Sequence, residues 1–415
     1  MHVIVVGGGI IGVTSAYYLR QQGHEVTVIE RRSGVAQETS FGNAGVIAPG
    51  YVTPWASPGM PRKVLSYLFK AEAPVLFRPN ANPALWRWLA RWFSQCNLAD
   101  FRINRGRMQR LALYSRDQLH ALRDALSIEY ERGQGYLQLF RSERDLALSA
   151  PVRTMLDESG IRYELLDPQR VREREPGLSP STPLAAGLFL PDDESGNCPM
   201  FARRLRQIAE DDGVRFVFGQ QVERIVFESG RASGVLVKDQ KMPADAVLVA
   251  AACDSVSLLR QCGIRAPIYP VKGYSATVTL DPGAIGPQHA LMDEAYKTAI
   301  TPFGNRLRVA GTAEIGDAQL TLRDAALRTL VRVASDWFPG AARYNEAQFW
   351  VGARPMLPDG PPLLGPTSRP GLFLNAGHGS NGWAMACGSA KVLADLISGR
   401  EPEISMDGLT LARYH

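Results

Sequence analysis

Three glycines near the amino terminus have a spacing that can bind a pyrophosphate. Gly7, Gly9 and Gly12 fit the pattern G-x-G-x-x-G, in which the first glycine permits a tight turn and the second lets phosphates approach the backbone. The third allows a helix to pack closely on a strand, and the first N–H groups of that helix favour negative charge. Glu30 follows Gly12 by 18 residues and can accept hydrogen bonds from ribose hydroxyls. These residues predict a site for the ADP half of a dinucleotide.

A second glycine-rich turn lies near the carboxyl terminus. It separates a strand-like run at 372–375 from a helix-like segment at 383–398, and its glycines are Gly377, Gly379 and Gly382. The N-terminus of a second helix, with Asn381 as a hydrogen-bond donor, suits the edge of a flavin ring that becomes anionic on reduction. A nicotinamide enzyme needs only one such turn. The pair of turns therefore favours FAD over NAD.

The residues around the first turn predict a β-α-β unit. Residues 3–6 are β-branched and apolar, which is typical of a buried parallel strand. Helical spacing of apolar and small residues follows, Gly23 can cap that helix, and residues 26–29 make a second strand. A third buried strand in DAVLVAAACDS, far along the chain, fits the same sheet. The cofactor domain is therefore expected to be discontinuous.

The remaining segments alternate in character. A Gly/Pro-rich stretch at 31–61 predicts a loop that lies along the cofactor, with a surface linker as the alternative. The other expectations are helices over 62–128, short strands and turns over 133–191, a helix at 199–212, strands over 266–315 and a helix at 321–337.

One predicted helix has an unusual composition. In NPALWRWLARWF, one face carries Leu85, Trp88, Leu89 and Trp92, while Arg87 and Arg91 lie opposite. A Trp/Arg amphipathic helix can lie on a bilayer, but the same stripe more often packs on a domain core. We favour the core.

Composition limits the class of protein. A chain of 415 residues predicts two domains, and a formal charge of +5 with dispersed arginines gives no nucleic-acid footprint. Five cysteines without a CxxC motif indicate a reducing compartment and no metal site. No run of 18 apolar residues exists, and the first strand leaves no room for a signal peptide. We expect a cytoplasmic protein, with peripheral association with the cytoplasmic face of the inner membrane left open.

The chain resembles the D-amino-acid dehydrogenase small-subunit type within the D-amino-acid oxidase family of FAD-dependent oxidoreductases. The matching stretches include GGGIIGVTSAYYLRQQGHEVTVIERR, ETSFGNAGVIAPGYVTPWASPG, YPVKGYS, FWVGARPMLPDG and LNAGHGSNGWAMACGSAKVLADL. The resemblance implies hydride transfer from Cα of a D-amino acid to flavin N5. The imino acid then hydrolyses to a 2-oxo acid and ammonia, and electrons pass to a quinone or another carrier.

The expected fold class is α/β. It combines a discontinuous Rossmann-like FAD-binding domain with a mixed α+β substrate domain built on an antiparallel-type sheet. We place the FAD-binding domain at 1–75, 190–265 and 346–415, and the substrate domain at 76–189 and 266–345.

The resemblance also implies site residues. Arg354 in GARPM matches the arginine that binds the substrate carboxylate, for which a guanidinium offers bidentate geometry; a structural arginine on a turn is the alternative. Apart from the resemblance, Arg306 and Arg308 alternate on a predicted strand and are either rival anchors or solvent-exposed side chains. The other candidates for catalysis are Tyr274, His378 and Asn381. His378 is as compatible with a structural loop role as with polarising the substrate. The expected cofactor-binding residues are Gly7, Gly9, Ile10, Ile11, Gly12, Glu30, Arg31, Ser40, Asn43, Ala44, Gly45, Val222, Ala251, Gly377, Gly379, Asn381 and Gly382.

Two departures from the family pattern leave the substrate open. Members of the D-amino-acid dehydrogenase type usually read GHGTLGW, whereas residues 377–383 read GHGSNGW, and Val46 stands where glutamine is usual. D-proline or cis-4-hydroxy-D-proline is therefore an alternative substrate. An NAD(P)-linked dehydrogenase and a flavin-bearing scaffold subunit that works with partner subunits are the competing functions.

Overall fold

The computed structural model describes residues 1–67, 73–317 and 319–414. Its first sheet is centred on the predicted amino-terminal strand, β1 (His2–Val6), which pairs in parallel with β2 (Glu25–Glu30) and β12 (Ala246–Val249). The six strands lie in the order β18-β19-β12-β1-β2-β8. The remaining three are β8 (Arg215–Phe218), β18 (Leu363–Pro366) and β19 (Leu372–Ala376). All neighbours are parallel except β18, which is antiparallel to β19, and the predicted strands of β1 and β12, far apart in the sequence, lie side by side.

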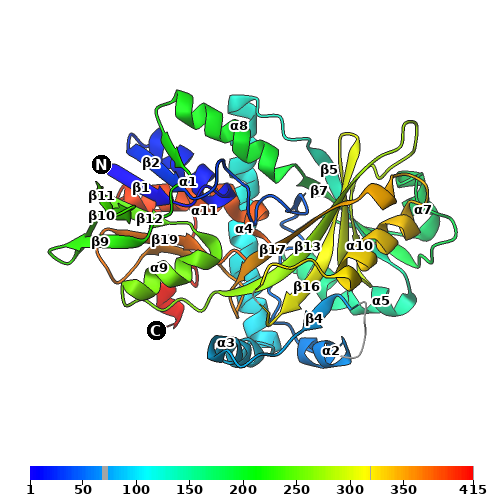
Figure 1. The fold of residues 1–415 in the computed structure, drawn as a ribbon. Coiled ribbons are helices and arrows are strands. Elements are labelled where there is room, and N and C mark those ends of the chain that lie inside the picture. Colours follow the sequence, from blue (N-terminus) through cyan, green and yellow to red (C-terminus); the bar gives the residue numbers. More distant parts are fainter. Residues whose placement is uncertain (68–72, 318, 415) are drawn as a thin grey trace.

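Two helices that follow the glycine turns lie together on one face of this sheet. α1 (Ile10–Gln21) packs against α11 (Gly382–Ile397) and α8 (Cys198–Asp211), and α4 (Leu98–Leu126) packs against α11 (Figure 1). Their apolar side chains form one continuous core with the sheet. The opposite face is covered by α9 (Ser255–Gln261) and a small sheet of β9 (Arg224–Glu228), β10 (Arg231–Val237) and β11 (Gln240–Pro243).

A second, larger sheet makes the other half of the molecule (Figure 1). Its main path is β17 (Gln348–Met356), β13 (Tyr269–Thr279), β16 (Arg306–Ile315), β15 (Thr298–Phe303), β14 (Ala290–Asp293), β5 (Gly133–Phe140), β7 (Ala186–Ser195) and β3 (Val46–Ile47). Most neighbours are antiparallel, as predicted, although β14 and β5 are parallel. α10 (Asp324–Trp337) packs on β13, β15 and β16.

The structure corrects two predictions of secondary structure. The expected helical region 62–128 contains α2 (Met60–Tyr67), α3 (Pro83–Ser94) and α4, but β4 (Val75–Phe77) interrupts it because that segment pairs with β16. The expected strands and turns over 133–191 also contain three helices. They are α5 (Glu143–Leu148), α6 (Ala150–Glu158) and α7 (Pro168–Arg174), and β6 (Glu164–Leu166) lies between the last two. Residues 68–72 of the first region lie outside the described residues.

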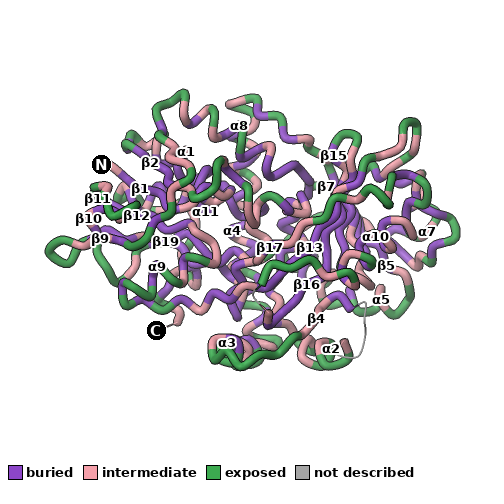
Figure 2. The backbone as a smooth tube through the Cα atoms, in the orientation of Figure 1, coloured by how far each residue is buried: buried purple, intermediate pink, exposed green. Residues whose placement is uncertain are grey.

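The short helices η1 (Ala252–Asp254), η2 (Tyr344–Glu346) and η3 (Leu411–Tyr414) complete the chain. Figure 2 shows that buried residues follow both sheets and the helices between them, while exposed residues edge the molecule. The two-domain division stays a proposal. β17 hydrogen-bonds into the large sheet and α4 packs on α11, so both cross the boundaries that we drew.

Candidate active site

A cleft of about 250 Å³ runs along the ends of β1, β2, β12 and β19 and contacts both glycine turns. Most of the predicted cofactor residues line it. These are Gly7, Gly9, Ile10, Ile11, Glu30, Arg31, Ser40, Asn43, Val222, Ala251, Gly377, Gly379 and Gly382, and His378 lines it as well. Among the predicted residues, Gly12, Ala44, Gly45, Asn381, Tyr274 and Arg354 lie outside this lining.

The first turn has room for a ligand on one side only. A Cβ added to Gly12 would lie 1.8 Å from the Gly7 carbonyl oxygen, and one added to Gly7 would lie 2.7 Å from the Ala250 carbonyl oxygen. Both glycines are thus required by packing between β1, α1 and β12. A Cβ at Gly9 would meet only the Ser40 hydroxyl, at 3.4 Å. The backbone of Gly9 is therefore open to an approaching phosphate, as the motif predicts.

Polar side chains hold the backbone around this turn. The Ser40 hydroxyl accepts a hydrogen bond from the Ile10 N–H (3.1 Å), which belongs to the first turn of α1. The Glu30 carboxylate accepts hydrogen bonds from the N–H groups of Gly8 (2.6 Å) and Arg32 (2.7 Å). Glu30 is therefore fixed at the carboxyl end of β2, where its oxygens line the cleft.

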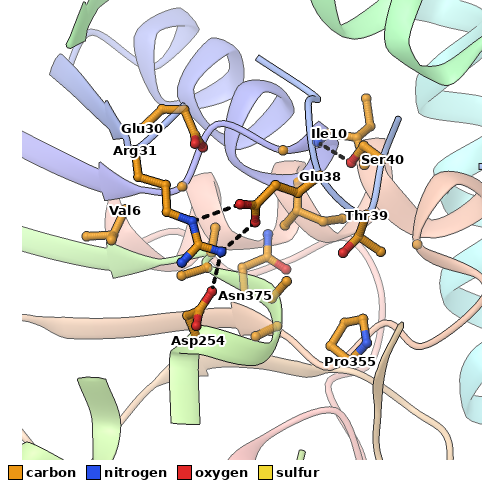
Figure 3. A pocket seen from close by; sticks show the side chains of 18 of the residues that line it. Val6, Ile10, Glu30, Arg31, Glu38, Thr39, Ser40, Asp254, Pro355 and Asn375 are labelled. Carbon is orange, nitrogen blue, oxygen red and sulfur yellow. Dashed lines mark hydrogen bonds and ion pairs between the residues drawn. The ribbon is translucent and has the colours of Figure 1, made fainter. Parts of the chain in front are cut away.

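Arg31 links two sides of the cleft (Figure 3). Its guanidinium donates two hydrogen bonds to Glu38 (2.8 and 2.7 Å) and lies 2.8 Å from an Asp254 oxygen. Burial alone would raise the pKa of Glu38, but the hydrogen bonds from Arg31 and Arg32 hold that pKa below its usual value. The loop after β2 is thereby tied to the segment after β12.

The second turn places polar groups at the other end of the cleft. The His378 ring is buried, its Nε2 lies 3.2 Å from the Ser389 hydroxyl, and burial lowers its pKa to about 3. The ring is therefore neutral at physiological pH. Asn375 donates to Ser15 (3.1 Å), while its buried Oδ1 has no partner in the described structure. Asn381 is the N-cap of α11 but makes no side-chain capping bond.

The Arg354 guanidinium lies next to this end of the cleft and is not matched by an anion. Its neighbour Pro355 lines the cleft, and its own nitrogens contact only the carbonyl oxygens of Lys272 (3.3 Å) and Gly311 (3.5 Å). Within the described residues no carboxylate pairs with it, and burial lowers its pKa to about 10. A partly buried guanidinium without an acidic partner can bind a carboxylate through two charge-assisted hydrogen bonds.

A glycine makes this arrangement possible. Gly273 in β13 has no side chain, and a Cβ built there would lie 2.3 Å from the Arg354 Cζ atom. The guanidinium therefore lies across the strand at Gly273. The centroid of the Trp55 ring, from the segment between β3 and α2, lies 6.0 Å from the Arg354 Cζ atom. The signal for this fit, a glycine inside a long strand, is present in the sequence.

The structure separates Arg354 from the other proposed anchors. Tyr274 is buried on the opposite face of β13, where its hydroxyl donates to Glu314 (2.6 Å). Arg306 pairs with Glu131 (2.9 Å). The Arg308 guanidinium donates to backbone carbonyls of the loop over the sheet rather than to an acid.

That loop, residues 39–45, is tied down by three elements. Thr39 donates to the Ala353 carbonyl of β17 (2.9 Å), and Ser40 accepts from α1 as described. Arg308 of β16 donates to the carbonyls of Phe41 (3.0 Å) and Asn43 (3.1 Å). The loop, predicted to lie along the cofactor, thus connects the two sheets beside the cleft.

Several lining residues were not predicted. Asn375 lies one residue before the end of the buried strand β19, so the sequence could have indicated its position, as it could that of Trp383 at the start of α11. Thr39, Pro355, Gln220, Glu223 and Gln261 carry no local signal and reach the cleft through tertiary packing. All five cysteines are free thiols, and no group of three potential metal ligands occurs within the described ranges.

The fold and the cleft define a dinucleotide-binding oxidoreductase with a second sheet over one end of the cleft. The residues that line the cleft fit FAD. The backbone of Gly9 is open to a pyrophosphate, and at the other end of the cleft the second glycine turn and the Asn375 Oδ1 atom, which has no hydrogen-bond partner among the described residues, can bind a polar group.

The chain belongs to the DAO family of FAD-dependent oxidoreductases, whose model matches residues 2–396. It is 47% identical to a D-amino acid dehydrogenase of Rhizorhabdus wittichii over 416 residues, which is 100% of each chain. It is 44% identical to a D-amino acid dehydrogenase of Vibrio cholerae, covering 100% of this chain and 99% of that one. The fold is also similar to glycine oxidase from Geobacillus kaustophilus, with a TM-score of 0.77, 23% identity and coverage of 99% and 98%.

Proposed function

We propose that this enzyme oxidises the Cα–N bond of D-amino or D-imino acids and that Arg354 binds the substrate carboxylate. The observation that carries the proposal is the partly buried Arg354 guanidinium, which has no acidic partner among the described residues and whose neighbour Pro355 lines the cleft. The full-length relatives named D-amino acid dehydrogenase support the class of substrate.

The binding energy comes from a charge-assisted pair. A carboxylate that replaces the weak carbonyl contacts of Arg354 would form two parallel hydrogen bonds with one guanidinium. The missing side chain of Gly273 lets the guanidinium lie against β13, and the Trp55 ring lies 6.0 Å from its Cζ atom. The substrate is thereby held by one end, which fixes the position of Cα relative to the cleft.

The cofactor supplies the chemistry, and the chain supplies position and electrostatics. When bound, FAD accepts a hydride from the substrate. We assign the first turn, Ser40 and Glu30 to the ADP half, and the second turn with Asn375 to the flavin half. His378 is neutral and adds no charge at the flavin end of the cleft. We assign the stabilisation of negative charge there to the first N–H groups of α11 and the positive end of its helix dipole.

We also propose that electrons leave to a quinone or a similar carrier at a membrane, with which the protein associates peripherally. No helix in the described part of the chain is long and apolar enough to cross a bilayer. Two water-exposed aromatic residues on α3, Trp86 and Phe93, support association from the surface.

A substrate panel with an artificial electron acceptor tests the proposed function. The purified, flavin-loaded chain is assayed alone with paired D- and L-amino acids, and with D-proline and cis-4-hydroxy-D-proline. We expect turnover of D-substrates without any partner subunit and no turnover of the L-enantiomers. Absence of D-substrate turnover by flavin-loaded protein would contradict the proposal, and turnover that needs NAD would replace it with the nicotinamide alternative.

A further inference from the structure

We propose that the outer surface of α2, α3 and the first turns of α4 docks on an anionic phospholipid bilayer. We call this surface the docking face and define it by Arg62, Lys63, Leu65, Trp86, Arg87 and Phe93. The inference deepens the proposed function, because it assigns the contact through which the enzyme would reach a carrier in the membrane. The inference rests on the proposed function only for the reason why the enzyme would bind a membrane.

α3 has two apolar faces, and only one of them is buried. Leu85, Trp88 and Trp92 pack in a cluster with residues of β13, β16 and β17, which confirms the predicted core stripe. Trp86 and Phe93, seven residues apart and therefore on one side of the helix, are 48% and 65% exposed. A surface helix of a globular protein normally carries one apolar stripe. The second stripe is available to a partner.

The exposed Trp86 ring is held in place. Its indole N–H donates to the Asn80 carbonyl (2.8 Å), and its ring packs edge-on against Phe77 with centroids 6.4 Å apart. A fixed aromatic ring loses little freedom when it inserts into an interface. Tryptophan is also enriched at the level of lipid headgroups, where its apolar ring and polar N–H are both accommodated.

Neighbouring elements extend the apolar surface. Leu65 on α2 is 61% exposed, and Leu98 and Ile103 in the first turns of α4 are each 52% exposed. α2 and α3 lie along the same side of the molecule, at the bottom of Figure 1, and Figure 2 shows exposed residues there. Five of the thirteen large exposed hydrophobic residues in the described chain thus fall between residues 65 and 103, on α2, α3 and the first turns of α4.

The positive charge around the docking face indicates which kind of partner it binds. Residues 60–67 and 73–103 hold six basic side chains and one acidic side chain. No acidic side chain of the described residues pairs with Arg62, Lys63 or Arg87, and such basic groups attract phosphate. Basic residues next to an anionic membrane are attracted by its surface potential, whereas two copies of this face would repel each other. An anionic bilayer therefore fits better than a second copy of the chain.

The buried face of α3 connects the docking face to the active site. The Trp88 indole N–H donates to the Met356 carbonyl (3.1 Å), two residues beyond Arg354. Met356 also pairs with His378 in an isolated bridge and contacts the position of Gly379. One helix thus separates the proposed membrane contact from the end of the cleft where we place the flavin ring.

Flotation with lipid vesicles tests the inference. Flavin-loaded protein is mixed with phosphatidylcholine vesicles or with vesicles that also contain phosphatidylglycerol, and the floating fraction is measured. We expect flotation with the anionic vesicles only, and less at high salt. Trp86→Ala/Phe93→Ala should lower the bound fraction several-fold, and Arg62→Gln/Arg87→Gln should do the same. The matched control Leu148→Ala/Ile285→Ala removes exposed apolar side chains elsewhere and should float like the wild type.

Three outcomes would overturn the inference. They are a wild type that does not float with anionic vesicles, unchanged flotation of both docking-face variants, and a wild-type dimer that Trp86→Ala/Phe93→Ala converts to a monomer. Dye-linked turnover of these variants is measured in parallel and should match the wild type. Failure of flotation with intact turnover would refute only the docking face, whereas flotation without turnover of D-substrates would refute only the proposed function.

Discussion

Gly273→Ala should damage substrate binding while leaving the fold intact. The added Cβ would lie 2.3 Å from the Cζ and 2.4 Å from the Nη2 of Arg354, where ordinary contacts begin near 3.4 Å. The guanidinium must therefore move by about 1 Å, a displacement that can cost on the order of 100-fold in a positioned site. Gly273 does not have a positive φ, so the alanine backbone itself is unstrained.

The size of the effect follows from the bonds at risk. If the shifted guanidinium keeps only one of two charge-assisted hydrogen bonds to the carboxylate, the loss is about 1.5–3 kcal/mol. That loss corresponds to a rise in KM of about 10- to 100-fold for a D-substrate. Steady-state kinetics with an artificial acceptor measure it. Arg354→Lys, which keeps the charge but loses the fork, should raise KM to a similar extent.

Stability separates this explanation from simple misfolding. Because the clashing atoms are at the end of a flexible side chain, the free energy of unfolding should change by no more than about 1 kcal/mol. Gly106→Ala is the matched control, since a Cβ at this exposed position in α4 meets no atom within 4 Å. An unchanged KM in Gly273→Ala would refute the role of Arg354, and so would an equal rise in the control.

Two further predictions concern buried charged groups. Burial raises the pKa of Asp193, whose carboxyl accepts a hydrogen bond from the Gly50 N–H, to about 8. Between about pH 4 and pH 8 the native state therefore binds a proton that the unfolded state lacks, and the free energy of unfolding falls as pH rises. The gain in the free energy of unfolding from Asp193→Asn should therefore grow between pH 5 and pH 8, by up to about 1.4 kcal/mol per pH unit. The same pH dependence of stability in the variant and the wild type would contradict this. Arg308→Met should release the carbonyls of Phe41 and Asn43 and weaken FAD retention about tenfold or more, measured as free flavin after gel filtration. Retention equal to the wild type would show that the loop holds without Arg308.

Local sequence patterns predicted the cofactor cradle because each part of it is local. The strand β1, the first glycine turn, α1 and Glu30 lie within 30 residues, and each follows from periodicity or from the needs of a turn. The second turn was readable for the same reason. Arg31 was expected at the cofactor, but its pairing with Asp254 was not, since this partner follows β12, which is far from Arg31 in the sequence.

The substrate end depends on register, which no local pattern fixes. Arg354 pairs directly with Val271 on β13, so it shares a face with Gly273 and lies opposite to Tyr274. The alternation of side chains therefore takes Tyr274 to the α10 side of the sheet, where it packs in the core with a hydrogen bond to Glu314. Only the pairing of strands about 80 residues apart reveals this.

The missed helices had readable signals. Ser142 and Asp167 cap α5 and α7 by accepting hydrogen bonds from Asp145 and Arg170, and Pro168 stands in the first turn of α7. Their lengths of six and seven residues are too short for a clear apolar stripe, so capping residues were the only guide. β4, with three residues, forms only because β16 offers an edge for pairing.

The most direct test of the account is anaerobic reduction of the bound flavin, followed by its visible absorption. Flavin-loaded protein is mixed with a D-amino acid, with D-proline or with the L-enantiomers, and no electron acceptor is present. We predict that D-substrates bleach the flavin, that L-substrates do not, and that Arg354→Lys needs a much higher D-substrate concentration for half-maximal bleaching. A flavin that stays oxidised with every D-substrate, or bleaching by the variant at wild-type concentrations, would contradict the central claim.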